Sequence, residues 1–160
     1  MKAALSALAV LVMQGAQDAG TSQPARVRIT VRAIAATSGV EKTDPRLQPI
    51  AKNLSEFSKD FRYRNFQLVS EQTFDLGFSS AAQMELPGSR SVQVTPRQMD
   101  PQGRIRVHLE LLGEHPAHTR QLHTDYSIQR GGTIFVGGLR LDPKKPETGT
   151  LLVAVTQALE

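Results

Sequence analysis

The chain has 160 residues, no cysteine and a formal net charge of +4 from 19 basic and 15 acidic residues. The lack of cysteine excludes disulfides, thiol catalysis and Cys-based zinc sites. The charge excess is small and scattered, which argues against a nucleic-acid partner. It is compatible with an anionic surface component or an envelope protein as partner.

The N-terminal segment has the layout of a bacterial-type secretory signal. Lys2 gives a positive start, residues 3–13 form an apolar run, and small residues follow as far as Gly20. Such a run is too short to span a bilayer as a stable helix, and the absence of a following cysteine excludes a lipoprotein. We therefore expect residues 1–20 to be a signal peptide. Residues 21–160 should form a single α+β domain, periplasmic or extracellular, with no transmembrane span; a buried N-terminal helix or an uncleaved anchor is the alternative.

One strand and one helix are predicted in the first part of the domain. Residues 26–32 (RVRITVR) alternate apolar with basic or polar side chains, which predicts a half-buried strand. After a turn at Asp44-Pro45, an apolar stripe with spacings of three and four is formed by Leu47, Ile50, Leu54, Phe57 and Phe61. The stripe predicts an amphipathic helix over about residues 47–59. Pro49 must lie in its first turn, because proline lacks the backbone donor that deeper positions use.

The remaining chain is predicted to form about seven strands, which makes the domain α+β with mainly antiparallel sheet and one principal helix. The segments whose alternation suits these strands lie around residues 66–68, 74–78, 84–86, 92–94, 105–111, 122–128, 133–141 and 150–159. Gly131-Gly132 should form a tight turn, and Gly137-Gly138 should mark a bulge or a close backbone approach. We expect residues 133–139 and 151–157 to pair as antiparallel strands across an exposed turn from Asp142 to Gly149.

The histidines are clustered in the sequence. His108, His115, His118 and His123 are all four, and Glu110 and Glu114 lie among them. Imidazole and carboxylate groups are ligands of zinc. However, the alternation places His108 on the outer face of its strand, and His115 and His118 flank a proline in a loop. We expect surface histidines and no cofactor; the candidate metal ligands are His115, His118, His123 and Glu114.

Several arginines occupy outward positions of predicted strands. The candidate partner-binding residues are Arg26, Arg28, Arg32, Arg104 and Arg106. If their strands are neighbours, they form a basic face, whereas scattered charges would only protect the sheet from pairing with other chains. No catalytic motif is present. The sequence therefore favours a non-catalytic binding or assembly domain. The alternatives are an exported hydrolase or metal-binding enzyme using the His108–His123 cluster, and a carrier of a small apolar or lipid ligand.

Three C-terminal segments have the apolar patterns of strands, and the middle one also contains two glycine pairs: IRVHLELLGE, TDYSIQRGGTIFVGGLRLD and TGTLLVAVTQAL. With these motifs, residues 105–159 resemble the last strands of the secretin family, the outer-membrane gate rings of bacterial secretion and pilus systems. The matching residues are Gly132, Thr133, Ile134, Val136, Gly137, Gly138 and Leu139, then Leu151, Leu152, Val153, Val155 and Thr156. Gln157 and Ala158 stand where that family has proline and arginine. The resemblance implies a secretin-like hairpin in an envelope protein that acts beside such a machine, without the pore function.

We predict that the mature protein begins between Gln17 and Ser22 and is recovered outside the cytoplasm, because the small residues there suit signal cleavage. N-terminal sequencing of the protein from its native host measures this. An intact Met1 in the cytosolic fraction would contradict it.

Overall fold

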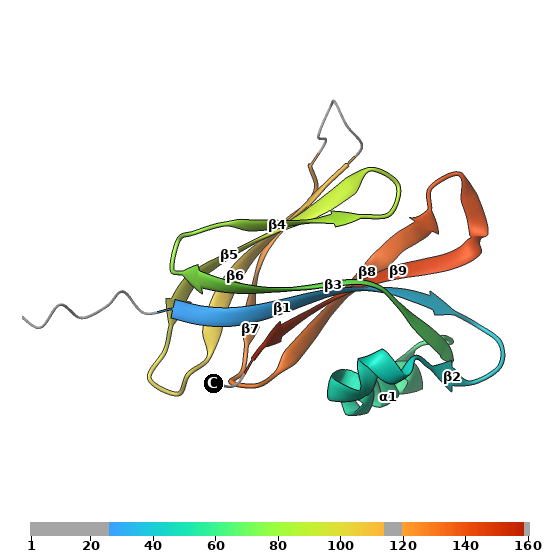
Figure 1. The fold of residues 1–160 in the computed structure, drawn as a ribbon, viewed down its shortest axis with the longest axis horizontal. Helices are drawn as coiled ribbons and strands as arrows, with labels where there is room; N and C mark the ends of the chain where they lie inside the picture. The colour runs from blue at the N-terminus through green and yellow to red at the C-terminus, as the bar shows by residue number, and fades with distance from the viewer. Residues whose placement is uncertain (1–25, 114–119, 159–160) are drawn as a thin grey trace, which may run out of the picture.

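The computed structural model describes residues 26–113 and 120–158, which form two β-sheets and one helical segment (Figure 1). The larger sheet has the order β2-β3-β1-β9-β8, with β1 (Arg26–Thr37), β2 (Lys42–Thr43), β3 (Asn65–Gly77), β8 (Thr133–Asp142) and β9 (Lys145–Gln157). The smaller sheet has the order β4-β5-β6-β7, with β4 (Ala82–Leu86), β5 (Arg90–Met99), β6 (Ile105–Leu112) and β7 (Arg120–Ile128). The helical segment consists of η1 (Pro45–Ile50) and α1 (Ala51–Asp60). The predicted α+β class is confirmed in outline. The larger sheet is mixed, because β2 runs parallel to β3.

The two sheets pack face to face around the main core. Alternate residues of a strand point to opposite faces, so each strand gives one set of side chains to this core. In β6, Val107 and Leu109 are at most 1% exposed, and in β1 the same holds for Ile29 and Val31. Complete burial of each such side chain contributes about 1.5–3 kcal/mol. The opposite face of β6 is left for polar residues.

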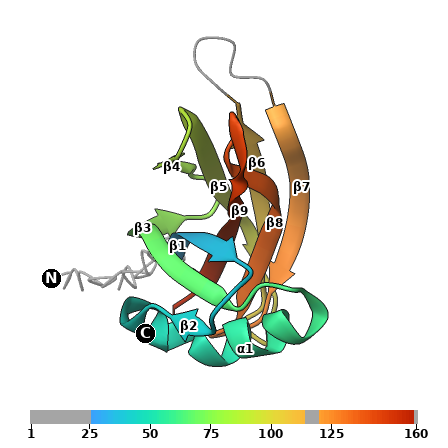
Figure 2. The same ribbon diagram turned by 90° about the vertical axis from the view of Figure 1, so that its right-hand side faces the viewer.

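A second, smaller core lies on the other face of the larger sheet, under the helical segment. Figures 1 and 2 show α1 on the side of this sheet that faces away from β4 and β5. Its buried members are Ile34, Ala36, Leu47, Ile50, Leu54, Phe66, Leu152 and Ala154. Of the predicted stripe, Phe57 is half-buried and stacks on the exposed Phe61 with ring centroids 4.3 Å apart. The predicted stripe therefore packs on the sheet from Leu47 to Phe57, whereas Phe61 lies beyond the end of α1 and is exposed.

The helical segment differs from the predicted helix 47–59 at its start. Residues 45–50 form a 3-10 helix that contains Pro49, and the α-helix begins only at Ala51. Pro49 has no backbone N–H to donate to the preceding turn, and its ring crowds that turn. The chain around it therefore forms the tighter 3-10 helix, and regular α geometry begins only after it. Asp44 caps the start by accepting a 2.9 Å hydrogen bond from the Arg46 backbone N–H. Its hydrogen bonds with Arg46 also hold the pKa of Asp44 well below the usual range.

A bulge in β3 corrects the expectation of two separate strands around residues 66–68 and 74–78. β3 is continuous, and the register with β1 shifts between Ser70, which opposes Ala33, and Leu68, which opposes Ile34. Val69 is therefore the extra residue, and it is 45% exposed. One extra residue reverses the facing of all that follow. Phe66 and Leu76 are an even number of residues apart and would share a face in a regular strand. Because of the bulge, Phe66 packs in the helix-side core and Leu76 in the main core.

The C-terminal hairpin is confirmed, with a shorter turn than predicted. Thr133 opposes Thr156 and Val136 opposes Val153 in an antiparallel pair. The register shifts at Gly137-Gly138, where Gly138 has φ +91°, so this pair marks the expected bulge. Strand pairing continues to Asp142 and Lys145, and the expected turn from 142 to 149 is reduced to Pro143-Lys144. Gly149 lies inside β9 instead, where a Cβ would come within 2.8 Å of the Ala36 carbonyl oxygen of β1, so the position favours glycine.

We predict that Leu54→Ala lowers the free energy of unfolding by about 2–5 kcal/mol, the usual range for a buried leucine. Leu54 is 1% exposed at the centre of the helix-side core. Chemical denaturation measures the change. Val40→Ala is the control, because Val40 is 83% exposed and its removal should cost under about 0.5 kcal/mol. A loss of that small size for Leu54→Ala would contradict the packing of α1.

Candidate functional site

Two polar pairs meet on the outer face of the smaller sheet, where β6 and β7 run side by side. Glu110 lies opposite His123, and His108 lies opposite Asp125. The residues between them on β6 point into the main core, so the alternation of the strand forces all four outward. Directly opposed residues have neighbouring side chains. The register therefore brings two His-x-acid pairs, from segments 13 or more residues apart, into one cluster.

The cluster is closely packed. His108 Nε2 lies 3.2 Å from Glu110 Oε1, and His123 Nε2 lies 3.5 Å from the same oxygen. The two imidazole rings meet edge to face, with centroids 4.4 Å apart. The side chains of His108 and Glu110 are 12% and 17% exposed, whereas that of His123 is 50% exposed. The side of the cluster formed by His108 and Glu110 is thus mostly buried, and the side formed by His123 is open to solvent.

The spacing of these atoms suits a tetrahedral metal ion. One ligand atom from each of His108, Glu110 and His123 lies within 4.8 Å of the other two. Zinc bonds to nitrogen and oxygen are about 2.0–2.1 Å long, which separates tetrahedral ligand atoms by about 3.3 Å. The two distances to Glu110 Oε1 already match this value. Two imidazoles and one carboxylate can therefore hold a divalent transition metal after a small closing movement, with a fourth position left open.

Asp125 orients one of the imidazoles. Its Oδ1 lies 2.6 Å from His108 Nδ1, on the opposite side of the ring from Glu110. A carboxylate at Nδ1 fixes the ring and directs Nε2 toward a metal, which is the usual outer-shell arrangement of metal-binding histidines. The hydrogen bond from His108 lowers the pKa of Asp125, and the charges of His108, Arg97 and Arg106 add to this effect. The carboxylate consequently stays ionised as the acceptor at Nδ1.

The structure brings together a different set from the predicted metal ligands. Of the predicted residues, His123 is in the cluster, while His115, His118 and Glu114 lie outside the described residues. The alternation argues against His108 because it faces outward, yet the shared outer face is what joins it to His123. Sequence reasoning did not identify Asp125. The signal for it was the repeated His-x-acid spacing on two neighbouring strands.

The arginines named as partner-binding candidates lie in two separate places. Arg26, Arg28 and Arg32 are on β1 in the larger sheet, whereas Arg104 and Arg106 are at β6 in the smaller sheet. They therefore do not form one basic sheet face. Arg32 is only 7% exposed and bonds Glu71 at 2.7 Å. Arg26 pairs with Asp75 at 3.0 Å, and Arg104 lies 3.9 Å from Asp100.

No family model, curated protein or solved structure matches the chain. The resemblance of residues 105–159 to the secretin family therefore stays a prediction from sequence motifs. Among the helices of the described part, none has the length and apolar character needed to cross a membrane.

We predict that Asp125 titrates below the ordinary carboxyl range in metal-free protein, because His108 donates to its ionised form. This bond stabilises the folded state at pH values above the ordinary carboxyl pKa. The stabilisation is lost as the pH falls through the lowered pKa of Asp125. Carboxyl 13C NMR with a chelator present measures the midpoint.

His108→Ala should raise that midpoint toward about 3.9, the unperturbed value for aspartate. His123→Ala is the matched control, since it removes the neighbouring ring and leaves the 2.6 Å His108–Asp125 contact in place. An unchanged midpoint in His108→Ala would show that this contact does not act on Asp125.

Proposed function

We propose that this protein is a metal-binding domain that holds a divalent transition metal of the zinc class through His108, Glu110 and His123. The observation that carries the proposal is the convergence of their ligand atoms within 4.8 Å on one face of the smaller sheet. Asp125 acts as the positioning residue for His108. The ligands are supplied by two paired strands whose other faces are anchored in the main core, which supports a preorganised site.

The open fourth position sets the role of the metal. A three-ligand site leaves room for water or for a donor group from another molecule. The half-exposed His123 is on β7, at the edge of the smaller sheet, so the metal is accessible from solvent. Such a position suits metal binding or metal-mediated attachment to a partner. An open position also admits a water molecule that zinc can activate for hydrolysis, so a metal-dependent hydrolase remains the alternative use of the same cluster.

A second candidate function, a binding or assembly domain of the cell envelope, is favoured by the open strand edges. β7 is hydrogen-bonded only to β6, and β8 only to β9, within the described residues. A groove of about 360 Å³ lies between them, lined by Leu122, Tyr126 and Leu139 among others. Unpaired edges beside apolar side chains can accept a strand from another chain. The exported location and a place beside a secretion or pilus machine belong to this candidate function.

We predict that the purified protein binds one Zn²⁺ per chain, measured by isothermal titration calorimetry after chelator treatment. His123→Ala and Glu110→Gln should each abolish binding, because two ligands do not make a stable site. Asp125→Asn should weaken it by about 10–100-fold, the usual effect of losing an outer-shell carboxylate. At 100 times the dissociation constant, zinc should raise the unfolding free energy by about 2.7 kcal/mol.

The control is the double variant His115→Gln/His118→Gln, which removes the other two histidines of the chain. It should bind zinc as the wild type does. Loss of binding in this variant together with full binding in His123→Ala would transfer the site to His115 and His118 and overturn the proposal.

A further inference from the structure

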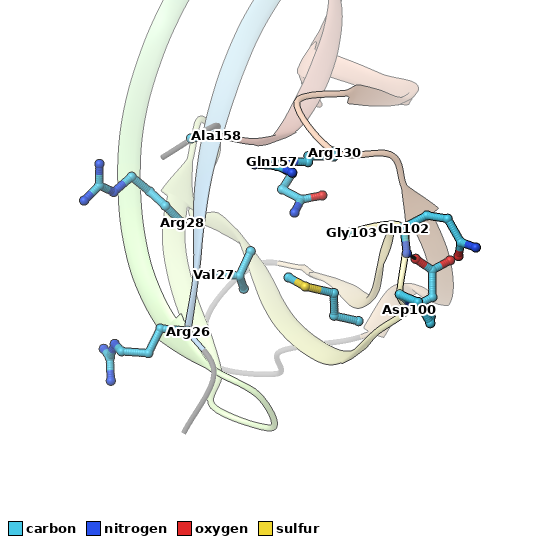
Figure 3. Close-up of a pocket in the computed structure, with 11 residues that line it drawn as sticks. Arg26, Val27, Arg28, Asp100, Gln102, Gly103, Arg130, Gln157 and Ala158 are labelled. Carbon is cyan, nitrogen blue, oxygen red and sulfur yellow. Dashed lines mark hydrogen bonds between the residues drawn. The ribbon is translucent and has the colours of Figure 1, made fainter. Parts of the chain in front are cut away.

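A cavity of about 430 Å³ lies at the end of the sandwich where the turn between β5 and β6 approaches the start of β1 (Figure 3). It is bounded by the start of β1, the end of β9, the turn at residues 99–103 and Arg130. Its volume falls within the range of small-molecule sites, about 300–1,000 Å³. None of its residues belongs to the candidate metal site.

Gln157 lines this cavity and has an unpaired hydrogen-bond acceptor. The residue is 5% exposed, and its side-chain Oε1 is buried without a hydrogen-bond partner among the described residues. Figure 3 shows its side chain extending from β9 into the space between Val27 and the residue 100–103 turn. A buried acceptor without a donor destabilises a fold, so its presence calls for a specific explanation. The terminal torsion of an amide is soft, and Oε1 can therefore turn toward a donor in the cavity.

The other residues that line the cavity indicate the chemistry of the rest of the ligand. Val27 and the partly exposed Met99 supply apolar surface. The stem of Arg130 packs against Gly103, where a Cβ would lie 3.2 Å from the arginine Cδ. Arg130 is exposed and forms none of the ion pairs found within residues 26–113 and 120–158. A guanidinium without a protein partner is suited to a carboxylate, which it binds through two parallel hydrogen bonds.

We propose that this cavity binds an acylated amino acid with a free carboxylate, the group found at the C-terminus of a peptide. Arg130 binds the carboxylate, Oε1 of Gln157 accepts the amide N–H, and Val27 and Met99 contact the apolar side chain. A simple anion would leave the Gln157 acceptor unpaired, and a neutral amide would leave Arg130 unpaired. A ligand that carries both groups supplies the donor that Gln157 lacks and at the same time an anionic partner for Arg130.

The experiment is an NMR titration of the full chain with the peptide N-acetyl-Ala-Ala-Leu as free acid. We expect saturable shifts of the Gly103, Gly132 and Gln157 amides. Arg130→Gln and Gln157→Leu should each weaken binding by about tenfold or more. Gln157→Leu should also raise the Tm, because it removes the unpaired buried acceptor. N-acetyl-leucine is a second probe; if it binds as tightly as the peptide, the ligand is a free acyl amino acid, and otherwise it is a peptide end.

Arg28→Gln is the matched control. Arg28 borders the same cavity, but its side chain points away from it (Figure 3), and the charge change equals that of Arg130→Gln. It should alter affinity by less than about twofold. The proposal is overturned if Arg28→Gln and Arg130→Gln weaken binding equally, if the peptide amide binds as tightly as the acid, or if neither probe shifts these amides. A lower Tm in Gln157→Leu would show that Gln157 has a structural hydrogen bond, and would overturn it as well.

Discussion

Burial of β1 on both of its faces is the constraint on which the rest of the fold depends. Its odd-numbered residues from Val27 to Ala33 lie in the main core, while Ile34 and Ala36 lie in the helix-side core. β1 is also hydrogen-bonded along both edges, to β3 and to β9. A strand enclosed in this way fixes the position of its two neighbours and of the layers above and below. The smaller sheet and the helical segment both pack against the larger sheet, in which β1 is the central strand.

This arrangement also explains the one buried charge of β1. Arg32 lies on the helix-side face, 7% exposed, where a bare guanidinium would be costly to desolvate. Glu71 on β3 and Thr156 on β9 accept hydrogen bonds from it at 2.7 and 3.2 Å. The neighbouring row is completed by threonine pairs, Thr30 with Thr73 and Thr133 with Thr156. The part of the sheet that the helix leaves uncovered is thus satisfied by hydrogen bonds across the strands.

Features set by local pattern could be predicted from the sequence. The stripe from Leu47 to Phe57 and the alternation of β6 each depend on neighbouring residues, and both were read correctly. The division of strands between two sheets could not be read, because the apolar alternation of β1 and β6 is the same in either sheet. The bulge at Val69 was also hidden, since the chain alternates regularly on both sides of it. A one-residue shift in register depends on tertiary packing, and the two-residue periodicity of a strand sequence contains no information about it.

The candidate site shows the same division. The sequence indicated the histidine cluster, but which histidines meet depends on the register of β6 with β7. That register is set by Val107, Leu109 and Leu111 in the main core, not by the polar residues themselves. The loop histidines looked equally suitable because spacing alone does not show which side chains a sheet will oppose.

The same independence of core and site bears on the role of metal. In small zinc domains the ion supplies the folding energy, because the apolar core is too small to do so. Here both cores are complete without any residue of the cluster. The carboxylates of Glu110 and Asp125 already have imidazole partners at 3.2 and 2.6 Å, so the metal-free cluster does not leave unpaired charges on the sheet. A metal would replace the Glu110–His108 and Glu110–His123 contacts while keeping the His108–Asp125 one. Changes to these side chains should therefore leave both cores intact, and under the proposed function they would act on metal affinity much more than on folding.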